Sequence, residues 1–244
     1  MFSSLFVFQY FFTFGLGLLV SVAGLYFRDR IMKLLITLLA AGAAIWFYTN
    51  GRLSGINSSV FLPDGTPGVA LVTSDQCGNG CEKARQHLRS RGIAFTEINA
   101  SQDPEGWKEL GKPRTLPFLA TGYEQAAGFN PGFFSSALGA SLGMGGLSAQ
   151  EQKIYAKHFY EHGEPKVVLY GTDWCGYCNR LRKNMEKEGI SYEYLNMEKP
   201  VKQTWLMNTM GIYGYPVVYV GYERVKKPNF DGLMDTLQSY PSIL

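Results

Sequence analysis

The most constraining feature of this 244-residue sequence is an internal repeat that places a pair of cysteines in each of its two copies. Each copy opens with a short apolar run, at residues 68–73 or 166–170, and a cysteine pair begins within five residues of it. The first cysteine of the pair is followed by a strand-opening proline after 40 residues in one copy and 41 in the other. A repeat of this kind indicates one supersecondary unit that the chain uses twice.

Both copies show the same succession of local patterns between the cysteines and the proline. Apolar residues four apart predict a helix after the second cysteine, and each helix is expected to end at a glycine, Gly92 or Gly189. A β-rich stretch follows at residues 93–98 and 190–195, then a polar segment that can form a helix, and then the strand that the proline opens. This order predicts an α/β fold for each copy.

The order of strands, helices, cysteines and proline is the plan of the thioredoxin fold. The second copy resembles a glutaredoxin from Lys166 to about Leu237, through the runs VLYGTDWCGYC, GYPVVYVG and NFDGL. The first copy resembles the same family through RTLPF and AGFNPGFF, which begin at Arg114 and Ala127. Together the two copies cover about 150 of the 244 residues.

We therefore expect an α/β chain with tandem thioredoxin-like (glutaredoxin) domains behind N-terminal transmembrane helices. The two domains are placed at residues 68–142 and 165–244. A Gly-rich break and a spacer helix fill residues 143–164, where SAQE at 148–151 has the pattern of a capping box. Residues 51–67 are rich in Gly, Ser, Asn and Pro, which is typical of a linker.

Residues 1–50 carry the pattern of a membrane-spanning helical hairpin. Residues 5–27 form a run of 23 residues without a charge. As a helix, this run reaches about 34 Å, enough for a hydrocarbon core of roughly 30 Å. A second apolar run follows at residues 31–48. A single span followed by a surface helix is the alternative. A signal peptide fits less well, because no positive side chain precedes the first run.

The basic residues near the two spans predict their orientation. Arg28, Arg30 and Lys33 cluster in the turn of the hairpin, whereas only Arg52 lies just past the second span. Since positive loops stay in the cytoplasm, the turn is expected there and both soluble domains on the non-cytoplasmic side. In a bacterium the membrane would be the inner, cytoplasmic one.

The charge balance argues against a nucleic-acid partner. The chain has 23 basic and 20 acidic residues, and the part beyond residue 50 has 20 basic and 19 acidic residues. A nearly neutral soluble part lacks the basic surface that binding to a phosphate backbone requires. No nucleic-acid partner is predicted.

The second cysteine pair is positioned for thiol–disulfide exchange. A Cys-x-x-Cys pair at a helix start puts both sulfurs on one face, within disulfide reach. The positive end of the helix and its free N–H groups stabilise the first sulfur as a thiolate. Cys175 is therefore the candidate nucleophile, and Cys178 is the candidate thiol that resolves a mixed disulfide. A structural disulfide or half of a zinc site is the alternative.

The resemblance implies a substrate-binding surface around this pair. Trp174 resembles the residue before the pair in thioredoxins, whereas Gly-Tyr177 between the thiols is closer to glutaredoxins. Pro216 resembles the cis-proline that faces the cysteines in this fold, and Tyr215 stands before it where glutaredoxins usually carry Val. Pro117 is the corresponding proline of the first copy.

The resemblance to glutathione-binding members of the family is partial. Thr172 occupies the position where the family commonly has a Lys for a glutathione carboxylate. Asp231 is kept from the stretch that holds the other end of glutathione, and Lys226 and Lys227 offer charge nearby. The expected partners are disulfide-containing proteins or glutathione as co-substrate, and no bound cofactor is predicted.

The first copy departs further from the family pattern. Cys77 and Cys81 are separated by three residues, Gly78, Asn79 and Gly80. This pair is a second redox site, a relay partner of the first site, or a structural bridge, and the sequence does not separate these alternatives.

Two other functions remain open at this stage. Some glutaredoxins hold an iron–sulfur cluster with glutathione, so a glutathione-dependent iron–sulfur or metal-binding module is one alternative. A non-catalytic redox interaction module is the other. His158 and His162 match an inverted zincin pattern, but a solvated helix face is the preferred interpretation and no metal site is predicted. His87 is expected on the polar, exposed side of the first copy's helix.

Overall fold

The computed structural model describes residues 60–244 of the chain. The two predicted membrane segments and most of the predicted linker lie outside the described residues. Within residues 60–244, no helix combines the length and the hydropathy needed to cross a membrane.

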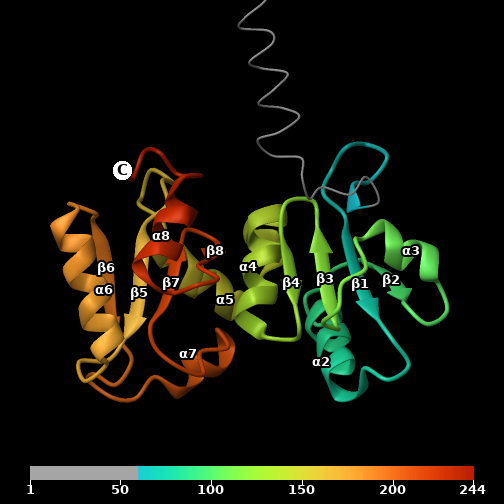
Figure 1. Cartoon of the computed structure of the whole chain (residues 1–244), viewed down its shortest axis with the longest axis horizontal. Helices are drawn as coiled ribbons and strands as arrows, with labels where there is room; N and C mark the ends of the chain where they lie inside the picture. The colour runs from blue at the N-terminus through green and yellow to red at the C-terminus, as the bar shows by residue number, and fades with distance from the viewer. Residues whose placement is uncertain (1–59) are drawn as a thin grey trace, which may run out of the picture. The chain divides into compact units, whose positions relative to one another are not determined.

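The first copy is built on a four-stranded sheet in the order β2-β1-β3-β4 (Figure 1). Strand β1 pairs in parallel with β2 and antiparallel with β3, which pairs antiparallel with β4. The elements are β1 (Val69–Thr73), α2 (Gly78–Arg89), β2 (Thr96–Asn99), α3 (Pro104–Glu109), β3 (Phe118–Thr121), β4 (Gln125–Ala127) and α4 (Pro131–Leu142).

The second copy repeats this topology in a sheet of order β6-β5-β7-β8. Strand β5 pairs in parallel with β6 and antiparallel with β7. The elements are β5 (Val167–Gly171), α6 (Gly176–Lys187), β6 (Tyr192–Asn196), α7 (Thr204–Thr209), β7 (Val217–Val220), β8 (Glu223–Arg224) and α8 (Phe230–Leu237). The helices and strands expected from the repeat are all present, and Gly92 and Gly189 have the left-handed φ values of 66° and 71° expected after the helices.

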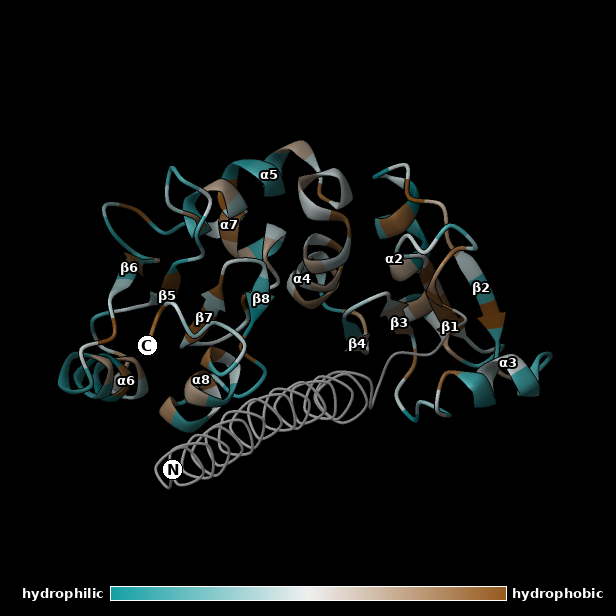
Figure 2. Ribbon diagram, turned by 90° about the horizontal axis from the view of Figure 1, so that it is seen from above, coloured by the Kyte–Doolittle hydropathy of each residue, from teal (hydrophilic) through white to brown (hydrophobic). Residues whose placement is uncertain are grey.

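The central strands are buried on both faces, which explains their continuous apolar runs. Val167 and Leu169 point to a core shared with α6 and α8, whereas Val168 and Tyr170 point to a second core that includes Ile154. This alternation follows the two-residue period of a strand. In the hydropathy colouring, β1 and β5 are largely brown and the outer helix α6 is largely teal (Figure 2).

The connection between the copies begins with the predicted capping box. Ser148 caps helix α5 (Ala149–Tyr155), and the Glu151 side chain accepts the Ser148 N–H in return. The helix is shorter than expected, because it passes at Tyr155 into a 3-10 turn that ends at His158 instead of continuing to Gly163.

A turn of the same form precedes the first strand of each copy. Phe159 and Pro165 form an antiparallel bridge around Gly163, which has a φ of 89°. Phe61 and Pro67 form the equivalent bridge around Gly65. The shared spacing Phe-x3-Gly-x-Pro is present in the sequence and extends the repeat upstream of the first strand.

Helix α4 packs against its own strands β3 and β4 and also against β8 of the second copy. Glycines make this second contact possible. A Cβ atom at Gly139 would lie 2.6 Å from the Cδ1 atom of Tyr222, and one at Gly132 would collide with the carbonyl oxygen of Met210. Helix α4 therefore approaches the second copy more closely than a helix with side chains at these positions could.

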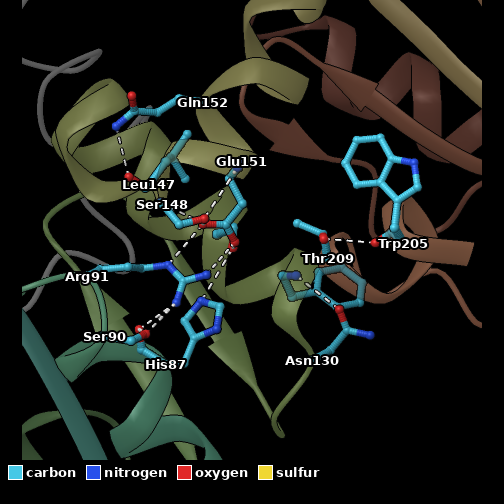
Figure 3. A network of polar contacts seen from close by, with 12 residues as sticks. His87, Ser90, Arg91, Asn130, Leu147, Ser148, Glu151, Gln152, Trp205 and Thr209 are labelled. Carbon is cyan, nitrogen blue, oxygen red and sulfur yellow. Dashed lines mark hydrogen bonds and ion pairs between the residues drawn. The ribbon is translucent and has the colours of Figure 1, made fainter.

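A buried ion pair ties the turn after helix α2 to helix α5 (Figure 3). Arg91 donates from Nη2 to Oε1 of Glu151 over 2.6 Å and from Nε to Oε2 over 3.0 Å. Ser135 of helix α4 donates a short hydrogen bond to the same carboxylate, which is fully buried. Burial alone raises the pKa of Glu151, but the hydrogen bonds from Arg91 and Ser135 lower it below its usual value. The charged pair is therefore retained inside the fold.

Two histidines that the sequence predicts on exposed faces are buried instead. His87 lies beside Ser135 and the ring of Phe134, and burial lowers its pKa to about 3. His158 bonds through Nδ1 to the carbonyl oxygen of Gly221 and through Nε2 to the hydroxyl of Tyr170, at 2.9 and 2.6 Å. Since a carbonyl accepts only, Nδ1 carries the proton and Tyr170 donates to Nε2. The solvated helix face expected for the histidine motif is wrong for His158.

The buried His158 predicts a loss of stability in mild acid. Burial, and secondarily the charge of Lys166, lower the pKa of His158 from 6.5 to about 4. The unfolded state therefore binds the additional proton between pH 6.5 and 4, and the free energy of unfolding falls as the pH drops through this window. In the His158→Gln variant, the free energy of unfolding should depend on pH less steeply in this window, by about 1.4 kcal/mol per pH unit. Urea unfolding at a series of pH values measures the slope.

His162→Gln is the matched control, because His162 belongs to the same sequence motif and its side chain is exposed. This variant should keep the wild-type slope. An unchanged slope in His158→Gln would contradict the assignment of the proton uptake to His158.

Candidate active site

The pairing of β5 with β7 brings the second cysteine pair and Pro216 to one end of the sheet. Tyr170 lies opposite Val217, so the chain leaving β5 towards the cysteines runs beside the chain that enters β7 from Pro216. Cys175 and Cys178 are joined by a disulfide with their Cα atoms 5.2 Å apart. The Tyr215–Pro216 peptide bond is cis, as the resemblance implies.

Cys175 is the N-cap of helix α6. Its backbone is extended, and its Sγ atom accepts the N–H of Cys178 over 3.1 Å. The sulfur therefore takes the place that Ser, Asp or Asn oxygen takes in most caps, against the positive end of the helix. Cys178 is fully buried inside the first turn, whereas Cys175 retains 5% of its exposure. The two sulfurs are thus unequal in both access and electrostatic environment.

Gly171 at the end of β5 allows the cysteine pair to sit against the sheet. A Cβ atom at this position would lie 3.0 Å from Sγ of Cys178 and 3.2 Å from the ring of Tyr194. The glycine was part of the family-like run but was not assigned a role from the sequence. Its role is to leave room for the buried sulfur.

Aromatic side chains surround the disulfide on the solvent side. Trp174 and Tyr177, which flank Cys175, are 70% and 73% exposed. The indole N–H of Trp174 donates to Glu198 over 2.8 Å, and its ring meets the ring of Tyr215 edge to face at 6.3 Å. The structure therefore places the rings of Trp174 and Tyr215 in contact next to the cysteine pair.

Two further exposed aromatics in this copy were not identified from the sequence. Trp205 lies on α7 and Tyr213 lies in the loop between α7 and Pro216, and they are 55% and 75% exposed. The segment around them also contains Leu206, Met207, Met210 and Ile212, so the sequence pattern did not separate the exposed aromatics from the core residues.

The charged groups close to the pair are already paired. Asp173 accepts from Lys199 and from the hydroxyl of Tyr194. The hydrogen bond from Lys199 lowers the pKa of the Asp173 carboxyl. Thr172 is fully buried, so the position where glutaredoxins commonly have a Lys has no charge and no access to solvent. Asp231 lies on the exposed first turn of α8.

The first copy closes its cysteine pair with a different geometry. Cys77 and Cys81 form a disulfide with Cα atoms 5.6 Å apart, and the additional residue is accommodated by Gly78 in the left-handed region at a φ of 57°. Gly80 faces Pro117, whose ring would be 3.4 Å from a Cβ atom there. Cys77 has helical backbone angles and makes no side-chain cap. The stabilising contact of Cys175 therefore has no counterpart at Cys77.

The stretch Gly128-Phe-Asn-Pro, part of the run that carries the family resemblance of the first copy, contacts the second copy. Asn130 from this stretch donates from Nδ2 to the carbonyl oxygen of Gly211 in the second copy, over 3.0 Å. Its Oδ1 atom accepts from the N–H of Phe133 and from Nη1 of Arg224. Asn130 therefore joins the start of helix α4 to the second copy.

No group of three or more His, Cys, Asp or Glu side chains that could hold a metal ion occurs among the described residues 60–244. Each cysteine pair is closed as a disulfide in this structure.

The chain is similar to known proteins in part of its length. Residues 167–225 match the model of the glutaredoxin family. Over these residues the second copy is similar to glutaredoxins. A 62-residue segment is 29% identical to glutaredoxin of Pseudomonas aeruginosa and covers 25% of this chain and 74% of that protein. An 84-residue segment is 29% identical to thioredoxin domain-containing protein R362 of Acanthamoeba polyphaga mimivirus, covering 30% of this chain and only 24% of that protein.

Two solved structures align with parts of the chain, each with a low TM-score. The holo form of glutaredoxin C1 from Populus tremula x tremuloides is 25% identical, with 30% of this chain and 74% of that chain covered and a TM-score of 0.25. The first two thioredoxin domains of Saccharomyces cerevisiae Eps1p are 9% identical, with 71% and 91% covered and the same TM-score.

The different caps predict different reactivity of the first cysteine in each copy. In the fully reduced protein at mildly acidic pH, iodoacetamide should modify Cys175 about fivefold faster than Cys77, since a helix-terminus interaction of up to about 1 kcal/mol favours its thiolate. Peptide mass spectrometry over time measures all four rates. Cys178 is the internal control, and equal rates at Cys175 and Cys178 would refute the assignment of the nucleophile.

Proposed function

We propose that the protein is a membrane-anchored, glutaredoxin-like thiol–disulfide oxidoreductase that works through Cys175 and Cys178. The observation that carries this proposal is the N-cap position of Cys175, whose sulfur accepts the N–H of Cys178 at the positive end of α6. The glutaredoxin family match over residues 167–225 supports it. The two copies then act as tandem domains, at residues 68–142 and 165–244.

In the proposed reaction the reduced protein transfers two electrons to a substrate disulfide. The Cys175 thiolate attacks one sulfur of the substrate, the substrate S–S bond breaks, and the leaving thiolate takes a proton from water. The thiolate of Cys178 then attacks Sγ of Cys175 in the mixed disulfide and releases the second substrate sulfur. The product is the Cys175–Cys178 disulfide, and a thiol reductant must reduce it before the next cycle.

Protein disulfides and glutathione mixed disulfides are the proposed substrates. Trp174, Tyr177, Tyr215 and Pro216 form the substrate surface next to the pair, and Asp231 is the proposed contact for a glutathione-like end group. In the first copy Pro117 lies against Gly80, between Cys77 and Cys81. We assign the Cys77–Cys81 disulfide to a secondary redox or structural role.

Serine variants test the proposal directly. Cys175→Ser should reduce disulfide reductase activity to the uncatalysed background, because the attacking sulfur is lost. Cys178→Ser should accumulate a mixed disulfide that mass spectrometry identifies. The double variant Cys77→Ser/Cys81→Ser is the matched control and should keep roughly half or more of the activity, because its site is separate. Wild-type activity in Cys175→Ser would refute the assignment.

Membrane anchoring through residues 1–50 is part of the proposal, with both cysteine pairs outside the cytoplasm. The uncharged run of residues 5–27 and the basic turn after it support this topology. In cells whose outer envelope is permeable, a membrane-impermeant thiol reagent should label reduced Cys175 in the full chain. Labelling that requires a breach of the cytoplasmic membrane would reverse the orientation, and extraction of the protein by alkaline carbonate would contradict the anchoring.

A further inference from the structure

We propose that the first copy positions the substrate loop of the second copy, and that Asn130 is a positioning residue for the Cys175 site. The substrate loop is defined here as residues 210–216, which connect α7 to β7 and end at Pro216. The inference rests on the proposed function, because the loop borders the proposed substrate surface. It assigns to the first copy a role that does not depend on its own cysteines.

The first step of the argument is a direct hydrogen bond from the first copy to the loop. Nδ2 of Asn130 donates to the carbonyl oxygen of Gly211 over 3.0 Å, between residues 81 positions apart in the sequence. Gly211 has a φ of 56° and is buried. A Cβ atom at Gly211 would collide with the Asn130 side-chain amide, so the two residues are in close contact.

The second step is the guanidinium of Arg224, which also bonds to backbone carbonyls of the loop. Nη1 of Arg224 donates to the carbonyl oxygens of Met210 and Gly211, over 3.0 and 3.3 Å, and to Oδ1 of Asn130 over 3.1 Å. The backbone N–H of Arg224 donates to Oγ of Ser136 on helix α4. The side chain is buried and lies over the ring of Phe133, 4.4 Å from its centroid. Helix α4 therefore holds both Arg224 and the loop.

The third step is the packing of the loop from its other side. Met210 and Ile212 are almost fully buried in the core that also contains Ile154 and Tyr155 of helix α5. Gly132 brings helix α4 against the Met210 carbonyl, where any Cβ atom would collide. The first half of the loop is thus enclosed by α4, α5 and β8.

The second half of the loop is open and carries the aromatic side chains of the site. Tyr213 and Gly214 are exposed, and Tyr215 meets the ring of Trp174 next to Cys175. One residue lies between the buried Gly211 and Tyr213, and four lie between Gly211 and Pro216. The position of Tyr213 and Tyr215 is therefore set by an anchor to which the first copy contributes Asn130 and helix α4. A substrate that binds to a pre-positioned loop does not have to order it.

The repeat provides a matched comparison within the chain. Gly111 occupies the position in the first copy that corresponds to Gly211, after Leu110 and ahead of Pro117. It also has a left-handed φ, 78°, but a Cβ atom there would meet nothing within 4 Å. Gly211, which contacts Asn130, thus belongs to the copy in which Cys175 caps its helix. Gly111, which has no such neighbour, belongs to the copy in which Cys77 makes no side-chain cap.

The test uses two variants of Asn130 that keep an N-cap acceptor for Phe133 but remove the amide donor, Asn130→Ser and Asn130→Asp. For an oxidised synthetic peptide with one intramolecular disulfide flanked by tyrosines, each variant should raise KM about 3- to 10-fold, the loss expected for one hydrogen bond. Turnover should stay within about twofold, and the alkylation rate of reduced Cys175 should not change, because α6 is untouched.

Amide hydrogen exchange gives a readout that does not depend on activity. The N–H of Ile212 bonds to the Met207 carbonyl over 2.8 Å, so its protection reports on the anchored half of the loop. Protection at Ile212 should fall about 3- to 10-fold in both Asn130 variants. Gly211→Ala should lower it further, whereas Gly111→Ala, with the same backbone strain but no neighbour, should leave Ile212 and KM at wild-type values.

The outcomes separate this inference from the proposed function. Inactive wild-type protein with lost Ile212 protection in the Asn130 variants refutes the proposed function and supports the anchor. Active protein with unchanged KM and unchanged Ile212 protection in these variants overturns the inference. A parallel loss of turnover, Cys175 alkylation and overall thermal stability also overturns it, since that pattern indicates general damage instead of loop positioning.

Discussion

The contact between helix α4 and the second sheet depends on two glycines that have only hydrogen atoms where other residues have a Cβ. Gly139 admits the ring of Tyr222, and Gly132 admits the backbone carbonyl of Met210. A helix that closes the first copy thereby also covers β8 of the second. The buried pair of Arg91 and Glu151 and the short helix α5 fill the remaining connection. One seam of close backbone packing thus joins two repeats that share a topology.

The two copies share one sheet topology but differ in the local geometry of their cysteine pairs. Both bring a cysteine pair and a cis-proline to one end of a sheet, because the register of the antiparallel pairing is conserved between them. A single additional residue between the cysteines changes the backbone of the first cysteine from extended to helical. Only the extended conformation lets sulfur act as the N-cap, so local backbone geometry separates the copies.

Local patterns in the sequence predicted most of the fold and the centre of the site. The helix after each pair, the C-terminal glycines, the capping box at Ser148 and the cysteine at the start of α6 are all governed by residues within a few positions. His87 and His158 were wrongly predicted to be exposed. Their respective partners Ser135 and Gly221 lie 48 and 63 residues away in the sequence. Asn130 was missed as a contact for the same reason, since Gly211 is 81 residues distant. Periodicity within a helix does not contain such information.

The close packing at Gly132 and Gly139 also limits which rearrangements of the gene leave both repeats folded. Two repeats joined by a loose linker can be duplicated, exchanged or lost one at a time. Here the first repeat covers part of the second, since helix α4 packs on β8 and its Gly139 lies against the apolar ring of Tyr222. A deletion that removed the first repeat would uncover that apolar surface in the second. The cysteine pair that departs from the family pattern is therefore inherited together with the one that keeps it.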